Sequence, residues 1–234
     1  MSRGLLISVS GIDSSGKSTQ LSRLLEAAQA RGERPVRLWS RPGYTPTLEA
    51  AKASLKRFRS SGAAATNTEG AKPRTYPRRA ASFRSGLRKR AWLSLALLDL
   101  IWWYGVRLRA WRAAGRTVIC DRYLPDCWVD FRVNFPDDDV ESWLLARALA
   151  AVAPRPDAAF LLHIPVEESL QRSLGRDRRF RESAAVLGRR LAVYEALAGE
   201  SGVAPLDGRR PAEALAREID ARVDAVRRSA KSSA

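Results

Sequence analysis

A chain of 234 residues, 45% of them hydrophobic, can bury one sizeable core, and it fits a single α/β domain as easily as two small ones. We take one domain as the starting point. Two cysteines are too few for a disulfide framework, and no signal-peptide pattern precedes the first apolar run, so we expect a cytoplasmic protein. The formal net charge of +16 first indicates nucleic-acid binding, but +11 of it lies between residues 52 and 90, so the basic excess is local.

Apolar runs of strand length alternate with stretches of helical pattern along the chain. Strands are expected at residues 5–9, 36–39, 117–120, 158–164 and 203–206, and helices at 16–31, 46–58, 87–113, 139–152, 166–174, 182–199 and 211–228. Such alternation is typical of a parallel sheet with helices on both faces. The sequence therefore predicts one three-layer α/β/α domain over residues 1–228, followed by a disordered tail at 229–234.

Two segments differ from this alternation. Residues 60–79 are rich in Ser, Gly, Ala, Thr and Pro and hold almost no large apolar residue, which indicates a flexible loop.

Residues 91–106 form the most hydrophobic stretch, yet this stretch is shorter than a bilayer span and contains Asp99. We expect a helix buried against the sheet. An alternative is that its aromatic residues and the basic loop before it contact a membrane surface.

The stretch GIDSSGKS at residues 11–18 matches the phosphate-binding pattern G-x-x-x-x-G-K-[ST], and it lies between a predicted strand and a predicted helix. The two glycines let backbone N–H groups converge on an anion at a helix N-terminus. Lys17 is expected to reach the β- and γ-phosphates of ATP, Ser18 to hold Mg²⁺, and Thr19 to contact the α-phosphate. The predicted ATP-binding residues are Gly11, Ile12, Asp13, Ser14, Ser15, Gly16, Lys17, Ser18 and Thr19.

A second charged motif, TVICDRY, occupies residues 117–123 and includes the third predicted strand. The carboxyl end of that strand lies beside the phosphate loop, where open α/β folds bind ligands. Asp121 is therefore expected to order the waters on Mg²⁺, and Arg122 to clamp the phosphate of an acceptor molecule.

A third motif, RSLGRDRRFR at residues 172–181, places five arginines between two helical segments. We expect residues 166–182 to form an arginine-rich lid that closes over ATP and supplies positive charge which the phosphate loop lacks.

The motifs GIDSSGKSTQ, RPGYTP, CDRY, the arginine-rich stretch and VAPLDGRRPAEAL together resemble thymidylate kinase over nearly the whole chain, with residues 57–86 as a basic insertion. The resemblance implies a P-loop NTP hydrolase-type fold with a five-stranded parallel sheet. It also implies ATP:nucleoside-monophosphate phosphotransferase activity with ATP and Mg²⁺, and a homodimer that the Trp-rich helix would support.

The same resemblance implies roles for individual residues. Asp13 would face the sugar hydroxyl of the acceptor and Mg²⁺, Arg122 would bind the acceptor's phosphate, and Arg176 and Arg179 would contact the transferred group. The expected catalytic residues are Lys17, Asp13, Arg122, Arg176 and Arg179, the expected substrate-binding residues are Arg41, Tyr44, Arg122 and Asp130, and the expected metal-binding residues are Ser18 and Asp121.

Three positions depart from the pattern of thymidylate kinases. Ala96 stands where an aromatic residue stacks on thymine, Leu100 follows Asp99 in place of an arginine, and Asp130 replaces a tyrosine. A site that lacks donors for a base edge loses discrimination between bases. We therefore expect the chemistry to be kept on dTMP or a related acceptor.

Two other functions stay open on the sequence alone. In the first, the same fold phosphorylates a hydroxyl of a sugar, nucleoside or lipid-linked glycan, and the basic insertion rests on an anionic membrane. In the second, the protein is a non-enzymatic nucleotide-dependent switch. Nucleic acid is a disfavoured partner, because the basic loop has few aromatic residues and no binding motif accompanies it.

Overall fold

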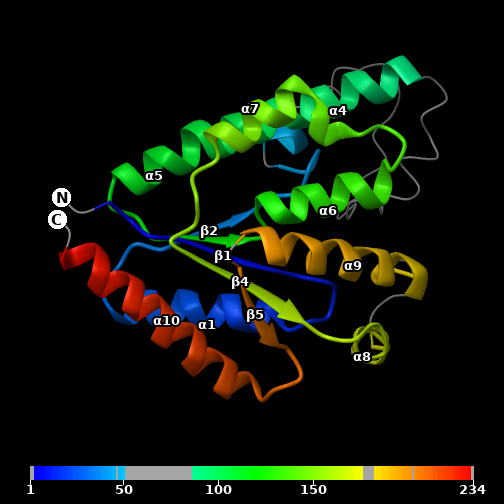
Figure 1. The fold of residues 1–234 in the computed structure, drawn as a ribbon. Helices are drawn as coiled ribbons and strands as arrows, with labels where there is room; N and C mark the ends of the chain where they lie inside the picture. Colours follow the sequence, from blue (N-terminus) through cyan, green and yellow to red (C-terminus); the bar gives the residue numbers. More distant parts are fainter. Residues whose placement is uncertain (1–2, 46, 51–85, 176–181, 202, 233–234) are drawn as a thin grey trace, which may run out of the picture.

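The computed structural model describes residues 3–45, 47–50, 86–175, 182–201 and 203–232. Within them, five strands form one all-parallel sheet in the order β2-β3-β1-β4-β5 (Figure 1). The strands are β1 (Leu6–Gly11), β2 (Val36–Trp39), β3 (Val118–Asp121), β4 (Ala158–His163) and β5 (Ala204–Asp207). The five predicted strands are thus confirmed, each to within two residues at either end.

Helices cover both faces of this sheet, as the sequence predicts (Figure 1). Below it lie α1 and α10, and above it lie α4 to α7 and α9. The bounds are α1 (Lys17–Ala30), α4 (Gly86–Ile101), the π-helical η1 (Trp102–Leu108), α5 (Arg109–Ala113), α6 (Leu124–Asn134), the 3₁₀ turn η2 (Val140–Ser142), α7 (Leu144–Val152), α8 (Val166–Arg172), α9 (Ala184–Ser201) and α10 (Ala212–Ser232).

The inner strands of the sheet alternate their side chains between two apolar layers, whereas Arg37 and Trp39 of the edge strand β2 are exposed. From β1, Leu6 joins the upper cluster with Leu93 and Leu97 of α4, while Ile7 and Val9 join the lower cluster with helices α1 and α10. Burial of both faces explains why the strands read as apolar runs.

Helix α4 and its continuation through η1 and α5 run unbroken over residues 86–113. This 28-residue helix is long and apolar enough to cross a membrane by length and composition alone, but 44% of its most apolar window is buried within the protein. Leu93, Leu97 and Leu100 are fully buried in the upper core. The helix is therefore a core helix packed against the sheet, as expected.

Three features of the fold differ from the prediction. Helix α6 has no predicted counterpart, the predicted helix at 139–152 is split by an extended Trp143, and α10 continues through Ser232 into the segment predicted as a disordered tail. For α6 the reason is visible in its sequence, because Asp126 and Asp130 lie on the buried face and obscure the apolar pattern.

Some predicted segments lie outside the described residues. The basic insertion at 57–86 lies outside them except for Gly86, and so does most of the predicted helix at 46–58. Residues 176–181 of the expected lid also lie outside them. Of the helix at 46–58, residues 47–50 are helical in the structure.

Candidate functional site

The loop between β1 and α1 depends on two glycines. Gly11 has φ +141°, and a Cβ atom there would lie 2.5 Å from the carbonyl oxygen of Leu162 and 2.9 Å from the Oγ of Ser15. Gly16 precedes α1 with φ +95°, and Ser14 also has a positive φ of 62°. Because side chains larger than hydrogen are strained in this region, the backbone from 11 to 16 specifies glycine at both ends.

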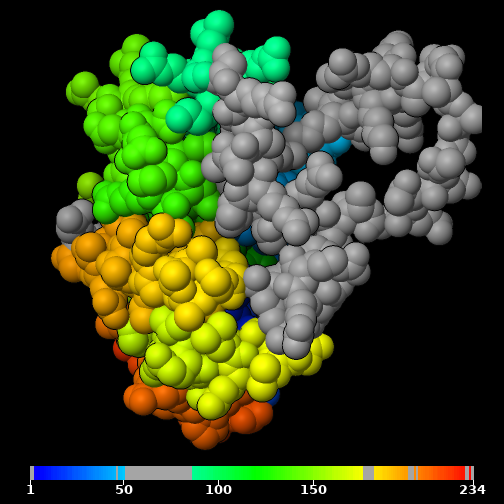
Figure 2. Space-filling model, turned by 90° about the vertical axis from the view of Figure 1, so that its right-hand side faces the viewer, coloured from blue at the N-terminus to red at the C-terminus, as the bar shows by residue number. Residues whose placement is uncertain are grey.

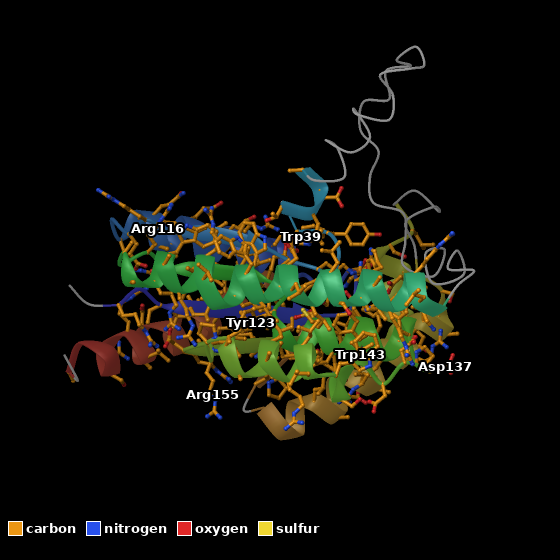
Figure 3. The ribbon with its side chains drawn as sticks, turned by 90° about the horizontal axis from the view of Figure 1, so that it is seen from above. Trp39, Arg116, Tyr123, Asp137, Trp143 and Arg155 are labelled. Carbon is orange, nitrogen blue, oxygen red and sulfur yellow. The ribbon has the colours of Figure 1, made fainter. Side chains whose placement is uncertain are left out.

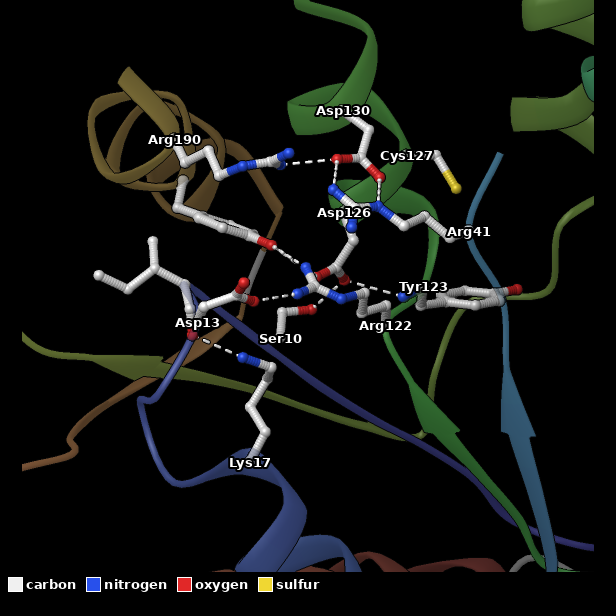
Figure 4. A network of polar contacts seen from close by, with 12 residues as sticks. Ser10, Asp13, Lys17, Arg41, Arg122, Tyr123, Asp126, Cys127, Asp130 and Arg190 are labelled. Atoms are coloured by element: carbon white, nitrogen blue, oxygen red, sulfur yellow. Dashed lines mark hydrogen bonds and ion pairs between the residues drawn. The ribbon is translucent and has the colours of Figure 1, made fainter. Parts of the chain in front are cut away.

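Lys17, the first residue of α1, reaches back across this loop (Figure 4). Its Nζ donates hydrogen bonds to the carbonyl oxygen of Ile12 at 2.6 Å and to the Oγ of Ser15 at 3.4 Å. Burial lowers the pKa of Lys17 to about 8, and Arg122 adds to this effect, while nearby aspartates oppose it. The structure thus holds a buried ammonium at the start of α1, with one carbonyl and one hydroxyl oxygen as partners.

A cavity of about 450 Å³ opens beside the loop at the carboxyl edge of the sheet. Nine of the ten residues that line it were selected by the sequence analysis, and Trp39 is the other: the lining consists of Asp13, Ser14, Gly16, Lys17, Ser18, Thr19, Asp121, Arg122, Arg172 and Trp39. Figure 2 faces this edge and shows α8 and α9 packed side by side next to it. Arg172, at the end of α8, adds a cation to the cavity wall.

The two predicted metal-binding residues both line this cavity. Ser18 is exposed, whereas the carboxylate of Asp121 is mostly buried and accepts a hydrogen bond at 2.5 Å from Arg37 of β2. Among the described residues, no group of three or more His, Cys, Asp or Glu side chains gathers to hold a metal ion. A cation in this cavity would therefore need ligands from a bound molecule in addition to the protein.

Arg122 lies where β3 leaves the sheet, and its backbone is strained, with φ 75°. Its guanidinium contacts Asp13 at 2.8 Å, Asp126 at 3.5 Å and the hydroxyl of Tyr194 at 3.4 Å. Burial opposes ionisation of Asp13, but Arg122 and Lys17 outweigh it and hold the pKa of Asp13 below its usual range. Arg122 is thus fixed beside the phosphate loop by an ionised partner.

Asp126 anchors this arrangement from the N-terminal turn of α6 (Figure 4). It is 2% exposed, and it accepts hydrogen bonds from the hydroxyls of Ser10 and Tyr194, each at 2.6 Å, and from the backbone N–H of Tyr123 at 2.8 Å. One carboxylate therefore ties β1, α6 and α9 together beside Arg122.

Asp130, one helical turn later, is completely buried between two arginines. Arg41 donates two hydrogen bonds to it, at 2.7 and 2.8 Å, and Arg190 of α9 donates a third at 2.6 Å (Figure 4). Burial alone would favour its neutral form, but the two arginines lower the pKa of Asp130 far below its usual range. Glu182, just after the undescribed part of the lid, pairs with Arg190 at 2.8 Å and lies 3.9 Å from Arg41.

The other predicted acceptor residues are not gathered in the same way. Tyr44 is 3% exposed and belongs to the upper core cluster, and Ala96 and Leu100 are fully buried on α4. Arg176 and Arg179 lie outside the described residues. Of the predicted acceptor set, the structure therefore brings Arg41, Arg122 and Asp130 together.

Sequence reasoning missed Ser10, Arg190 and Tyr194, which complete the charged cluster. A usable signal is present, because Asp126 and Asp130 are four residues apart on α6, as are Arg190 and Tyr194 on α9, and these two helices pack against each other. Residues spaced by four share one face of a helix. Matching polar pairs with this spacing on two neighbouring helices thus predict a polar network between them.

A comparison of the sequence with protein-family models finds no match, and a search of curated proteins finds no significant relative. Function is therefore inferred from the residues of this cavity and their geometry.

Proposed function

We propose that this protein is an ATP-dependent phosphotransferase of the thymidylate kinase type, with a P-loop fold, that transfers the γ-phosphate of ATP to a nucleoside monophosphate. The observation that carries the proposal is the cavity of about 450 Å³ in which Lys17 and the start of α1 meet Arg122 from β3. Phosphoryl transfer depends mainly on positioned cations on both sides of the transferred group, and this cavity provides them from two different elements.

The loop residues fit the phosphates of ATP. A helix leaves its first N–H groups without intrahelical partners and carries partial positive charge there, and α1 begins at Lys17 inside the cavity lining. The Oγ of Ser14 is buried and has no hydrogen-bond partner among the described residues, and a phosphate oxygen would supply one. Lys17 would then donate to the β- and γ-phosphates in place of the carbonyl of Ile12.

The cavity lining also fits a magnesium ion that arrives with ATP. The hydroxyl of Ser18 would bind it directly, and the carboxylate of Asp121 would accept hydrogen bonds from its waters. Bound in this way, Mg²⁺ neutralises charge on the transferred group. Arg37 holds Asp121 in place for this role.

On the acceptor side, Arg122 and Arg41 would bind the phosphate of the nucleoside monophosphate. Each guanidinium is already oriented by a buried or partly buried carboxylate, Arg122 by Asp13 and Arg41 by Asp130. Since both oxygens of Asp130 are engaged by arginines, we assign it the positioning of Arg41 and Arg190 rather than contact with the acceptor. An acceptor phosphate oxygen then attacks the γ-phosphorus, the bond to the β–γ bridging oxygen breaks, and ADP leaves.

The experiment is a coupled ADP-release assay with Mg²⁺ and ATP across the deoxy- and ribonucleoside monophosphates. We expect turnover with one or more acceptors in the wild type, and at least about a 10³-fold loss in Lys17→Ala, because transition-state charge is then unpaired. Lys89→Ala is the matched control, because Lys89 pairs with Asp138 on the surface, away from the cavity. Absence of wild-type turnover with every monophosphate contradicts the proposal.

A second candidate is a kinase of the same fold that phosphorylates a hydroxyl of a sugar, nucleoside or lipid-linked glycan. It is favoured by one observation: Ala96 and Leu100 are apolar and fully buried, so these positions offer no hydrogen bond to a base. In the same assay, ADP release with a nucleoside or sugar but with no monophosphate supports this candidate instead.

A further inference from the structure

The long helix over residues 86–113 exposes an apolar stripe on the side that faces away from the core. Leu95, Leu98, Trp102 and Val106 follow one another at spacings of three and four residues, and between 46% and 51% of each is exposed. Figure 3 shows this helix lying along one face of the molecule, with α7 beside it. Leu144 at the start of α7 is 80% exposed. Monomeric proteins seldom leave such contiguous apolar surface uncovered.

Positive charge borders this stripe at both ends. Arg88 and Arg90 are exposed before it, and Arg107 and Arg109 are exposed after it. The only acidic residue of the helix, Asp99, is 8% exposed and hydrogen-bonds to Thr45. Of the exposed acids close to the helix, Asp137 and Asp139 lie at its N-terminal end, where Asp138 pairs with Lys89 at 2.8 Å. Glu49 is also exposed, two residues from Thr47, which accepts a hydrogen bond from Trp103.

We propose that this face docks on the surface of an anionic lipid bilayer. The apolar stripe would enter the boundary between headgroups and acyl chains, and the flanking arginines would bind lipid phosphates and carboxylates. The helix lies on the bilayer rather than crossing it, because its opposite side, with Leu93, Leu97 and Leu100, forms the upper core.

The charge pattern selects a bilayer over a second copy of the chain. A second copy would bring the same exposed arginines against this face. An anionic membrane instead supplies the complementary charge along the entire stripe. This inference does not rest on the proposed function, since it involves no residue of the cavity at the phosphate loop.

The test is cosedimentation with phosphatidylcholine vesicles that contain phosphatidylserine, and with pure phosphatidylcholine vesicles. Leu98→Glu combined with Trp102→Glu removes the centre of the stripe. Ala221→Glu combined with Ala225→Glu is a matched control, because both alanines are exposed on α10, on the other side of the sheet, with the same spacing and the same added charge. The matched charge separates apolar insertion from the attraction of the remaining basic residues.

We expect the wild type and the α10 control to bind the phosphatidylserine vesicles alike, and the stripe variant to bind at least about tenfold more weakly. Leu95→Gln combined with Leu98→Gln, which adds no charge, is expected to weaken binding in the same direction. Urea unfolding of each variant confirms that it folds.

Three results overturn the inference. The first is no binding of the wild type to anionic vesicles, and the second is equal binding of the stripe and control variants, which would show that charge alone is responsible. The third is a wild-type dimer in analytical ultracentrifugation that the stripe variant dissociates, which would assign this face to a second copy.

Discussion

Replacement of Lys17 by methionine is expected to stabilise the fold while it abolishes the proposed function. Burial lowers the pKa of Lys17 from 10.5 to about 8. Since one pKa unit corresponds to 1.36 kcal/mol, keeping this ammonium protonated in the folded protein costs about 3 kcal/mol. Methionine fills a similar volume without a charge, but the Ile12 carbonyl and the Ser15 hydroxyl lose a donor. We therefore expect a net gain in stability of about 1–2 kcal/mol at pH 7.

The sign of the pH dependence follows from the same shift. Because the folded pKa of Lys17 is the lower one, the unfolded chain binds more protons between pH of about 8 and 10.5, so wild-type stability rises with pH across this window. The cost is fully present below pH 8, and the advantage of Lys17→Met shrinks as the pH rises through the window. Urea unfolding followed by circular dichroism measures both effects.

Lys89→Met serves as the control, because it removes a partly buried lysine away from the cavity, and we expect the loss of its pair with Asp138 to cost about 1 kcal/mol. A Lys17→Met protein that is less stable than wild type at pH 7, with Lys89→Met near wild type, would refute the reasoning on Lys17.

Three further predictions concern neighbouring parts of the molecule. Asp130→Asn removes the buried carboxylate that Arg41 and Arg190 share and leaves only Glu182 beside them, so the free energy of unfolding in urea should fall by about 3 kcal/mol, and an unchanged midpoint would argue against a charged Asp130. Gly43→Ala places a Cβ atom 2.3 Å from the ring of Trp92 at φ +76°, so we expect a loss of about 1–3 kcal/mol in the same assay, whereas wild-type stability would show that the turn adapts freely. Calorimetric affinity for ATP should decline above pH 8 as Lys17 loses its proton, and a flat profile up to pH 10 would mean that Lys17 does not bind phosphate.

The parallel sheet and the glycine-bounded loop before α1 were predictable because both depend on local patterns. Continuous apolar runs mark strands buried on both faces, and the glycines of the loop are required by backbone angles that only neighbouring residues determine. Lys17 and Ser18 therefore occupy the predicted place at the start of α1, in the cavity lining.

The charged cluster above the sheet was harder to predict, because it joins residues far apart in the chain. Arg41 and Asp130 are separated by 89 positions, and Arg122 and Tyr194 by 72. Helix α6 was missed for the same reason, since its aspartates are polar by composition but buried through partners that only the fold supplies. Tyr44, expected at the acceptor cleft, packs in the core instead because α4 covers it.

The claim that most of this account depends on is that the loop before α1 binds the triphosphate of ATP through Lys17. Isothermal titration calorimetry of the wild type and of Lys17→Met with ATP and Mg²⁺ tests it most directly. The account predicts saturable binding at one site in the wild type and at least about a hundredfold weaker binding in Lys17→Met. Absence of measurable heat in the wild type, or equal affinity of the two proteins, would contradict it.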